Sequence, residues 1–533
     1  MKKDKKITYI NFNYLIILSL LYSYSCRSTE QDNILSGSGV APVKINLLGS
    51  EYANSDKPAQ VASINQKTLT TDNNAEHYST LISPSSFISA ELTANRSLSP
   101  VASSKNLNTV AAVPGDQLGA GMKFRVIAFR KDNGNYQAYQ DYIVGQQAAP
   151  LMLDGGTTYN MVVYSYGSTT LPGINSSEQS NIGSAKIDYD NDNRDLMYQK
   201  ISDFTPNGNS NNTLNIKLRH KIPNITVTLK SNLTNSISSI SNALIGNNYP
   251  NAKFSINSGQ IVDWGSSNKV SVNFPSGVSN SLTSLPVFVN NDTSNGLFSA
   301  DVTVSGITKT IDLVNAFKIT PEYKSNLTIN LNSCGAYLGP GNTQWKEFMC
   351  HNLGADLSAD PFTPSAAIHG AKYKWGAKTG EIGRYISQSD DQDQSNNGAI
   401  AGWTVPDLSG NLWNSGTDAD PVKTDKDPCP SGYRVPTVFE WEKVIDFNSS
   451  TRIGSWENSP SNYSTAIKFG DRLLLPIPGY RVNSSGRLAD RGESGRYFSN
   501  SNNVGVLAIE PGYIKVVRED ARGHGFSVRC IAK

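Results

Sequence analysis

A chain of 533 residues is longer than one hydrophobic core usually serves, so we expect about three domains. Lysine and arginine number 47 against 45 aspartates and glutamates, and neither sign forms long blocks, which excludes nucleic acid and an acidic membrane surface as expected partners. The aromatic content and the modest charge exclude a globally disordered chain.

The N-terminus has the residue order of a secretory signal peptide. Four lysines precede an apolar run from Tyr14 to Leu21, and a short stretch then leads to Cys26. A basic, then apolar, then cleavable segment is typical of export. The apolar run is far shorter than the roughly 20 residues that cross a bilayer. We therefore predict that residues 1–25 are removed when the chain is exported.

The residues before Cys26 resemble a lipobox, the motif whose cysteine is diacylated and becomes the new N-terminus. The sequence departs from that motif at Ser23 and Tyr24, where a leucine and a small residue are usual. The alternative is an ordinary signal peptide with an incidental cysteine. The resemblance implies lipidation of Cys26 and an anchor in the outer membrane. Residues 26–41 lack apolar periodicity and predict a flexible tether on the order of 20 Å long.

Residues 42–331 contain short alternating apolar runs separated by Asn, Ser, Gly and Thr. The clearest runs are Met122, Phe124, Val126 and Ala128, alternating with Lys123, Arg125 and Ile127; Ile225, Val227 and Leu229; and Leu327, Ile329 and Leu331. A period of two predicts strands with one buried face. Many short strands favour two β-sandwich units over one very large sheet.

Composition changes sharply near residue 333. Four of the five cysteines and six of the seven tryptophans follow that position. A cysteine-poor β protein and a cysteine- and tryptophan-rich module achieve stability in different ways, so we place a domain boundary there.

The first part of the chain resembles the fimbrillin family of Bacteroidetes surface lipoproteins. The resemblance rests on residues 121–129, residues 150–166, Asp195-Leu-Met197 and residues 218–227. It implies two transthyretin-like β-sandwich domains, over residues 42–215 and 216–333. It also implies a role in pili or cell adhesion, with other pilus subunits as partners.

The last part, residues 334–533, resembles the Fibrobacter succinogenes major paralogous domain. The resemblance rests on residues 345–353, Lys372-Tyr-Lys-Trp-Gly376, residues 427–437 and Gly525-Phe-Ser-Val-Arg-Cys530. That domain is similar to C-type lectin-like modules and to the formylglycine-generating enzyme superfamily, which implies an α+β fold. Fimbrillin subunits polymerise by strand donation, and this extra C-terminal module would obstruct it. We therefore expect a pilus tip or a stand-alone adhesin, and not a shaft subunit.

The four internal cysteines predict two disulfides, because an exported chain meets an oxidising compartment. Sequence alone leaves three pairings open. The lectin-like resemblance implies Cys334 with Cys350 and Cys429 with Cys530, the second pair joining the start of a helix to the last strand. That helix is indicated by a capping box at Thr437 and Glu440, before an apolar face of Trp441, Val444 and Ile445.

The sequence shows no motif for catalysis or for a bound cofactor. Cys350-His351 has no second Cys or His at the spacing of a zinc site, and the histidines at 220, 369 and 524 are isolated. Two acidic stretches, residues 188–192 and 390–393, could bind calcium, but both lack the central glycine of an EF-hand loop. We interpret them as solvated loop charges, and we predict no metal, no cofactor and no enzyme activity.

A carbohydrate site in the last module would combine aromatic rings for sugar faces with amides or carboxylates for hydroxyl groups. Two irregular stretches provide these side chains, and most of the aromatic ones also suit a core. The candidate ligand-binding residues are Trp403, Asp407, Asn411, Trp413, Tyr480, Arg496 and Tyr497.

The sequence thus predicts a lipid-anchored, mainly β surface protein whose C-terminal module binds an extracellular glycan or protein. One alternative is a structural pilus or matrix component without a discrete ligand. The other is an enzyme of the formylglycine-generating type, which would require Cys429 and Cys530 to be free thiols beside a cleft.

Overall fold

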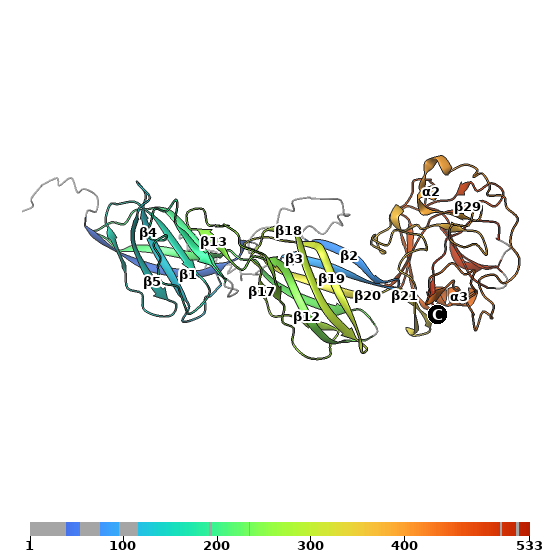
Figure 1. Ribbon diagram of the computed structural model, residues 1–533, viewed down its shortest axis with the longest axis horizontal. Helices are drawn as coiled ribbons and strands as arrows, with labels where there is room; N and C mark the ends of the chain where they lie inside the picture. The colour runs from blue at the N-terminus through green and yellow to red at the C-terminus, as the bar shows by residue number, and fades with distance from the viewer. Residues whose placement is uncertain are drawn as a thin grey trace, which may run out of the picture.

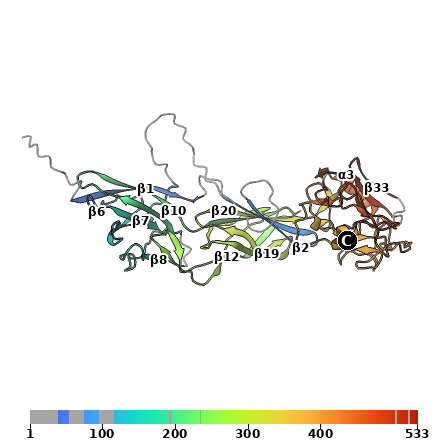
Figure 2. The same ribbon diagram turned by 90° about the horizontal axis from the view of Figure 1, so that it is seen from above.

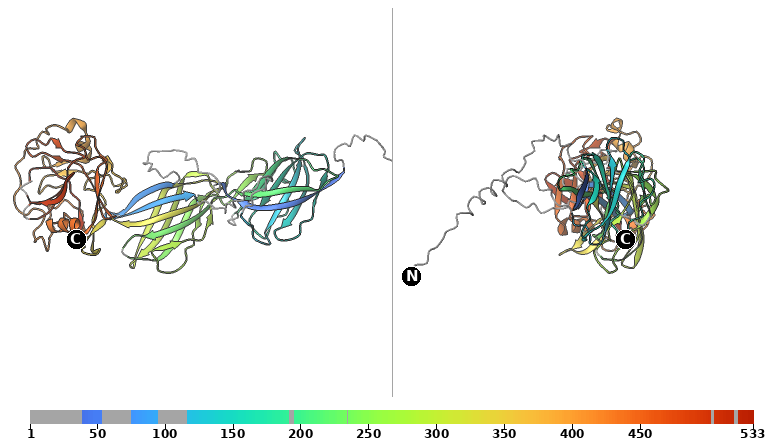
Figure 3. Two further views of the ribbon diagram at one scale, coloured as in Figure 1. Left: turned by 180° about the vertical axis from the view of Figure 1, so that it is seen from behind. Right: turned by 90° about the vertical axis from the view of Figure 1, so that its left-hand side faces the viewer.

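The computed structural model describes residues 39–53, 75–94, 116–190, 195–233, 235–501, 504–518 and 522–533. The described chain is mainly β, as the sequence predicts. Its strands and helices form three units in a row, called here the first, second and C-terminal units (Figure 1, Figure 2). Seen end-on, the units follow one another along a common axis (Figure 3).

The expected lipidation site at Cys26 and most of the expected tether lie outside the described residues. The end of that tether is corrected by the structure. The first strand already begins at Val40, and Ala41 is fully buried. Antiparallel pairing with Asp154 and Leu153 holds Val40 and Ala41 in the sheet.

The first unit contains a seven-stranded sheet in the order β5-β4-β7-β9-β10-β1-β6, covered by a three-stranded sheet in the order β14-β13-β8. The long neighbours β1 and β10 pair in parallel, and the other pairs of the unit are antiparallel. The strands are β1 (Val40–Glu51), β4 (Lys123–Arg130), β5 (Tyr136–Ile143), β6 (Leu151–Asp154), β7 (Tyr159–Ser165), β8 (Lys186–Tyr189), β9 (Met197–Phe204), β10 (Asn212–His220), β13 (Ala252–Ser255) and β14 (Gln260–Val262).

Strand β4 corrects the expectation of one buried face. Val126 and Ala128 belong to one apolar core, and Ile127 belongs to a second core on the opposite face of the sheet. Arg125, expected to face solvent, is 1% exposed. Its guanidinium forms ion pairs with Asp141 at 2.7 Å and Glu178 at 3.1 Å. The second face is buried because the β14-β13-β8 layer covers it.

The second unit packs two sheets around one apolar core. One sheet has the order β16-β11-β20-β3-β2, with β17 also paired to β11, and the other has the order β15-β12-β18-β19. The strands are β2 (Ala75–Ser83), β3 (Ser86–Ala94), β11 (Asn224–Ser231), β12 (Ile237–Asn248), β15 (Asn268–Ser271), β16 (Ser281–Thr283), β17 (Val287–Phe288), β18 (Thr293–Val304), β19 (Ile307–Ile319) and β20 (Lys324–Ser333).

Residue 216 is the expected boundary between the first two units. Strands from each side of it pair within the other unit. The hairpin β2–β3 comes early in the chain, yet β3 pairs with β20 of the second unit from Ser86 opposite Ser333 onward. In return, β13 comes late, yet it pairs with β8 of the first unit. Phe254 of β13 is fully buried and packs edge-on against Tyr198 of β9, with ring centroids 5.1 Å apart. The two units are therefore interleaved along the sequence.

The C-terminal unit combines short strands and helices around two apolar cores. The capping box of Thr437 and Glu440 is confirmed at the start of α3, where Trp441 and Val444 are buried. The elements are β21 (Gly335–Gly339), β22 (Thr343–Glu347), η2 (Ala366–Ile368), β23 (Lys372–Tyr373), β24 (Tyr385–Ile386), α2 (Gln388–Gln392), η3 (Gln394–Asn396), β25 (Tyr433–Arg434), α3 (Val438–Phe447), β26 (Ser450–Ile453), β27 (Ala466–Phe469), β28 (Leu473–Pro476), β29 (Tyr480–Arg481), β30 (Leu488–Ala489), β31 (Gly495–Phe498), β32 (Val506–Glu510), β33 (Tyr513–Val517) and β34 (Ile531–Ala532).

The turn of the β2–β3 hairpin holds the C-terminal unit against the second unit. The N–H groups of Cys334 and Cys350 donate to the carbonyl oxygens of Ser85 and Pro84, each at 2.7 Å. The Tyr433 hydroxyl also donates to the Ser85 hydroxyl at 2.9 Å. Three hydrogen bonds from separate segments to one turn fix the orientation of this junction. Within the described residues, none of the helices is both long and apolar enough for a membrane span.

Candidate functional site

The candidate site lies where the last segment of the chain joins two short strands of the C-terminal unit. Gly525 exchanges two backbone hydrogen bonds of 2.9 Å with Arg481 of β29, and Phe526 exchanges two more with Tyr373 of β23. Side chains from three distant parts of the sequence therefore meet beside His524.

We group four side chains with His524 and call the five the His524 cluster: Tyr480 contacts the imidazole ring, and the charges of Lys374, Asp407 and Arg496 act on its pKa. The imidazole of His524 stacks on Phe526, with centroids 5.6 Å apart, and meets the Tyr480 ring edge-on at 5.7 Å. Burial lowers the pKa of His524, while Asp407 raises it and Arg496 and Lys374 lower it further. The net shift is downward, so the imidazole is neutral at pH 7 and can accept or donate a hydrogen bond.

Lys374 and Trp403 form the inner wall of the cluster. The ammonium of Lys374 donates to the Trp403 carbonyl at 2.7 Å and lies 5.1 Å from the centroid of its ring. Burial lowers the pKa of Lys374, and nearby Asp407 opposes that effect. Trp403 is 1% exposed, and a Cβ on Gly525 would lie 2.7 Å from its indole. The indole therefore packs against backbone and presents no open face to a ligand.

Ion pairs and hydrogen bonds hold the outer residues of the cluster in place. Arg496 forms an ion pair of 2.5 Å with Glu510, and the Ser494 hydroxyl donates to the same carboxylate at 2.7 Å. Burial, and after it the charge of Asp490, raises the pKa of Tyr480. A half-buried tyrosine beside a paired arginine offers one aromatic edge and several fixed donors.

Of the seven candidate ligand-binding residues, Tyr480 contacts the His524 ring, and Asp407 and Arg496 lie close enough for their charges to act on the pKa of His524. Asn411 is exposed on the same irregular stretch as Asp407.

Trp403, Trp413 and Tyr497 are corrected, because all three are buried. Trp413 packs on Trp375 in the core, with ring centroids 4.7 Å apart. The Tyr497 hydroxyl donates to the Pro476 carbonyl at 2.6 Å. Large aromatic rings at these positions fill the core of the unit and leave no face for a sugar.

Lys374 and His524 are not among the ligand-binding residues that the sequence predicts. The available signal was the pair of glycines at 523 and 525, which flank the histidine where the backbone passes close to other chain segments. Within the described part of the chain, buried nitrogens of Arg384, Trp403 and His524 have no hydrogen-bond partner. Buried polar nitrogens of this kind are usually satisfied by water or by a ligand.

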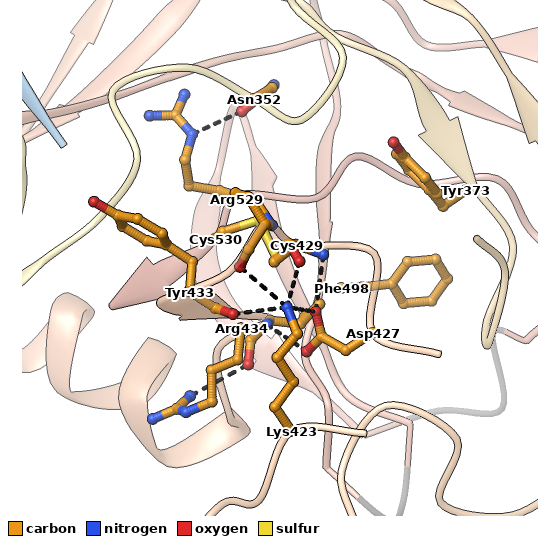
Figure 4. The surroundings of a disulfide bond; sticks show 12 residues. Asn352, Tyr373, Lys423, Asp427, Cys429, Tyr433, Arg434, Phe498, Arg529 and Cys530 are labelled. Atoms are coloured by element: carbon orange, nitrogen blue, oxygen red, sulfur yellow. Dashed lines mark hydrogen bonds and ion pairs between the residues drawn. A yellow bond between two sulfur atoms is a disulfide. The ribbon is translucent and has the colours of Figure 1, made fainter. Parts of the chain in front are cut away.

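The four internal cysteines form the two disulfides that the lectin-like resemblance implies, Cys334–Cys350 and Cys429–Cys530. The second one is buried beside Lys423, whose ammonium donates to carbonyl groups and pairs with Asp427 at 3.3 Å (Figure 4). Asp427 in turn accepts from the N–H groups of Cys429 and Val435, each at 2.9 Å. Neither sulfur of this pair is available as a free thiol, which the formylglycine-generating alternative requires.

The two acidic stretches behave differently from a calcium loop. Asp188 forms an ion pair with Lys253. Asp391, expected to be solvated, is instead fully buried with Lys372, Arg481 and Arg491 around it, and this corrects the expectation. In the described segments, no three His, Cys, Asp or Glu side chains are grouped as metal ligands.

Similarity to known proteins is found only among solved structures. No family model matches the sequence, and no curated protein matches it. Among solved structures, a candidate cell adhesion protein from Bacteroides fragilis is 12% identical with a TM-score of 0.30, over 54% of this chain and 92% of that one. A fimbrial assembly protein from Parabacteroides distasonis is 10% identical with a TM-score of 0.28, over 43% and 86%. At these identities and TM-scores the matches assign the chain to no family.

Proposed function

We propose that this protein is an exported, lipid-anchored surface adhesin that binds an extracellular glycan or protein through the His524 cluster. Lipidation at Cys26, a location at the outer membrane and a place at a pilus tip or as a stand-alone protein belong to this proposal. So do the transthyretin-like and lectin-like assignments of the three units.

The observation that carries the proposal is the linear arrangement of the units. Strand β1, which follows the expected anchor in the sequence, lies in the unit at one end, and the C-terminal unit lies at the other (Figure 1). Strand β29, which carries Tyr480, lies farther from the second unit than β21 does. An anchor at the first end would therefore present the cluster away from the membrane.

The junction between the second and C-terminal units also supports the proposed role as an adhesin. In the hairpin turn, the carbonyl oxygens of Pro84 and Ser85 accept hydrogen bonds from the backbone N–H groups of both cysteines of the first disulfide. A ligand pulling on the C-terminal unit would load these bonds and the long β3–β20 pairing behind them. A fixed junction of this kind suits a protein that transmits force between a surface and an anchor.

The test is a glycan and protein array probed with the full chain and with two variants. Asp407→Asn removes one charge from the His524 cluster without changing its shape. Asp420→Asn is the matched control, because Asp420 is exposed on the same irregular stretch. We expect a ligand whose affinity falls about tenfold in Asp407→Asn, the loss of one charge-assisted hydrogen bond, and is unchanged in Asp420→Asn.

A flat array, reproduced with calcium present, would instead favour a structural pilus or matrix component. Assembly has a separate test. Immunogold labelling along the whole length of purified fibres would contradict the tip or stand-alone location.

A further inference from the structure

The junction of the first and second units contains a pocket that lies far from the His524 cluster in the sequence. Its volume is about 470 Å³, within the range of pockets that bind small ligands. Its walls come from the loops that connect β10 with β11, β12 with β13, β14 with β15, β17 with β18, and β19 with β20. Both units therefore contribute to it.

One wall of this junction pocket is aromatic. Trp264 is 42% exposed, and it is the single tryptophan before residue 333. The Tyr249 ring meets it edge-on, with centroids 5.0 Å apart and an interplanar angle of 65°. An exposed indole supported by a second ring is a large apolar face that the core does not use.

The backbone on either side of Trp264 is fixed. Asp263 forms an ion pair of 2.7 Å with Lys186 of β8. The Gly265 N–H donates to the Asn251 carbonyl at 2.8 Å, and a Cβ on Gly265 would lie 2.7 Å from that oxygen. The backbone that carries Trp264 is therefore anchored on both sides, and the Tyr249 ring supports the indole, which lowers the entropic cost of binding.

A second wall of the pocket, joined to the first through the backbone of Tyr249, is polar and is also held by hydrogen bonds. The Tyr249 N–H donates to the Asn290 carbonyl at 3.0 Å, and the Asn290 amide donates back to the Tyr249 carbonyl at 2.9 Å. The Asn291 amide donates to the Asn247 carbonyl at 2.7 Å. Asp292 and Gln260 line the same pocket and are exposed, so their carboxylate and amide groups can meet a ligand.

The charges of the pocket indicate a neutral ligand. Among the described residues that line the pocket, Lys221 is the only basic one, and its ammonium is paired with Glu322. A phosphate or sulfate would meet Asp292 without a free cation to compensate it, and a cation would meet a single exposed carboxylate. A neutral molecule with one apolar face and many hydroxyl groups matches both walls.

We propose that the junction pocket binds a neutral oligosaccharide, with one sugar ring stacked on Trp264 and its hydroxyl groups held by Asp292 and Gln260. This site is separate from the His524 cluster and does not depend on it. Binding would also fix the angle between the first two units, because their loops line the same pocket.

The experiment measures the binding of neutral oligosaccharides built from glucose, galactose, mannose and N-acetylglucosamine to the full chain by titration calorimetry. Trp264→Ala removes the stacking face. Tyr139→Ala removes a similarly exposed ring, 38% exposed, from β5 of the first unit. We expect at least one saccharide to bind the wild type and Tyr139→Ala equally and to bind Trp264→Ala about tenfold more weakly or worse.

Asp407→Asn distinguishes the two sites. It alters only the His524 cluster, so saccharide binding at the junction pocket should keep the wild-type affinity. Equal binding to the wild type and Trp264→Ala would overturn the proposal. So would the absence of binding by every neutral saccharide at millimolar concentration, or a response to charged saccharides alone. Circular dichroism of each variant checks that the exposed substitutions leave the fold intact.

Discussion

The guanidinium of Arg529 donates a hydrogen bond of 2.8 Å to the carbonyl oxygen of Cys350. Arg529 directly precedes Cys530, so this bond connects the neighbourhoods of the two disulfides. Further bonds run to the Met349 and Leu474 carbonyls, each at 3.0 Å. The guanidinium also donates to the Asn352 side chain at 2.9 Å (Figure 4). Burial lowers the pKa of Arg529 to about 10, which leaves it charged at neutral pH.

Replacement of this arginine is expected to destabilise the C-terminal unit severely. Arg529→Leu leaves the carbonyls of Met349, Cys350 and Leu474 buried without their donor, at a cost of about 3 kcal/mol or more. Arg518→Ala is the control, since its exposed ion pair with Glu442 is worth at most about 1 kcal/mol. Urea unfolding followed by tryptophan fluorescence measures both. Equal midpoints for the two variants would contradict the structural role of Arg529.

Acid is expected to weaken the same unit through Asp391. Burial alone would raise the pKa of this carboxyl, but Lys372, Arg481 and Arg491 lower it to about 2. The unfolded chain binds this proton near pH 4, so the stabilisation is present above that pH and is lost as the pH falls from about 4 to about 2. The loss is roughly 2 kcal/mol.

The measurement is the urea midpoint between pH 5 and pH 2. The exposed control Asp420→Asn should keep the wild-type slope, whereas Asp391→Asn should flatten it and lower stability at pH 7. If Asp391→Asn does not fold, the wild-type slope still decides: a flat profile below pH 4 would contradict the prediction.

His351 is expected to produce a second loss of stability at higher pH. Burial, and after it Arg529, lowers the pKa of His351 to about 4, although its imidazole N–H donates to the Ala359 carbonyl at 3.0 Å. The unfolded chain takes up this proton near pH 6.5 and the folded chain only near pH 4. Stability is therefore lost as the pH falls from about 6.5 to about 4, by about 2 to 3 kcal/mol.

His351→Gln keeps a donor for the Ala359 carbonyl and removes the titrating group. Burial also lowers the pKa of His369, so the variant should reduce the pH slope between 6.5 and 4 without abolishing it. Urea midpoints at pH 7, 6 and 5 test this. An unchanged slope would show that His351 does not titrate as the structure indicates.

The sequence predicts elements whose signals are local. Alternation identifies β11 and β20, and the capping box at Thr437 and Glu440 identifies α3. Alternation does not say what covers the second face of a strand. Arg125 therefore appears solvent-facing in the sequence but is buried, and its guanidinium bonds to Pro172 and Glu178, 47 and 53 residues later in the chain.

The candidate site was predictable only in part for a related reason. Aromatic residues serve both cores and binding surfaces, so the sequence alone does not distinguish buried Trp413 from half-buried Tyr480. Asp391 looks like a solvated charge because its partners, Arg481 and Arg491, are 90 and 100 residues away. Long-range packing, and not local pattern, decides the role of each of these side chains.

The exchange of strands between the first two units leads to a prediction about where a substitution acts. Phe254 lies well after residue 216 in the chain, but it is fully buried in the first unit against Tyr198. Phe254→Ala should cost about 3 to 5 kcal/mol, and the loss should fall on the first unit. Hydrogen exchange should therefore accelerate in β7 and β8 and change little in β12.

Phe298→Ala is the matched control, because Phe298 of β18 is equally buried but belongs to the core of the second unit. Its effect should appear in β12 and β18 instead. Trp264 directly follows β14, and β13 and β14 are strands of the first unit. Opening of the first unit by Phe254→Ala should therefore also loosen the Trp264 loop. Exchange that accelerates in β12 to the same extent in both variants would mean that the two units unfold as one body, and the assignment of Phe254 to the first unit alone would then fail.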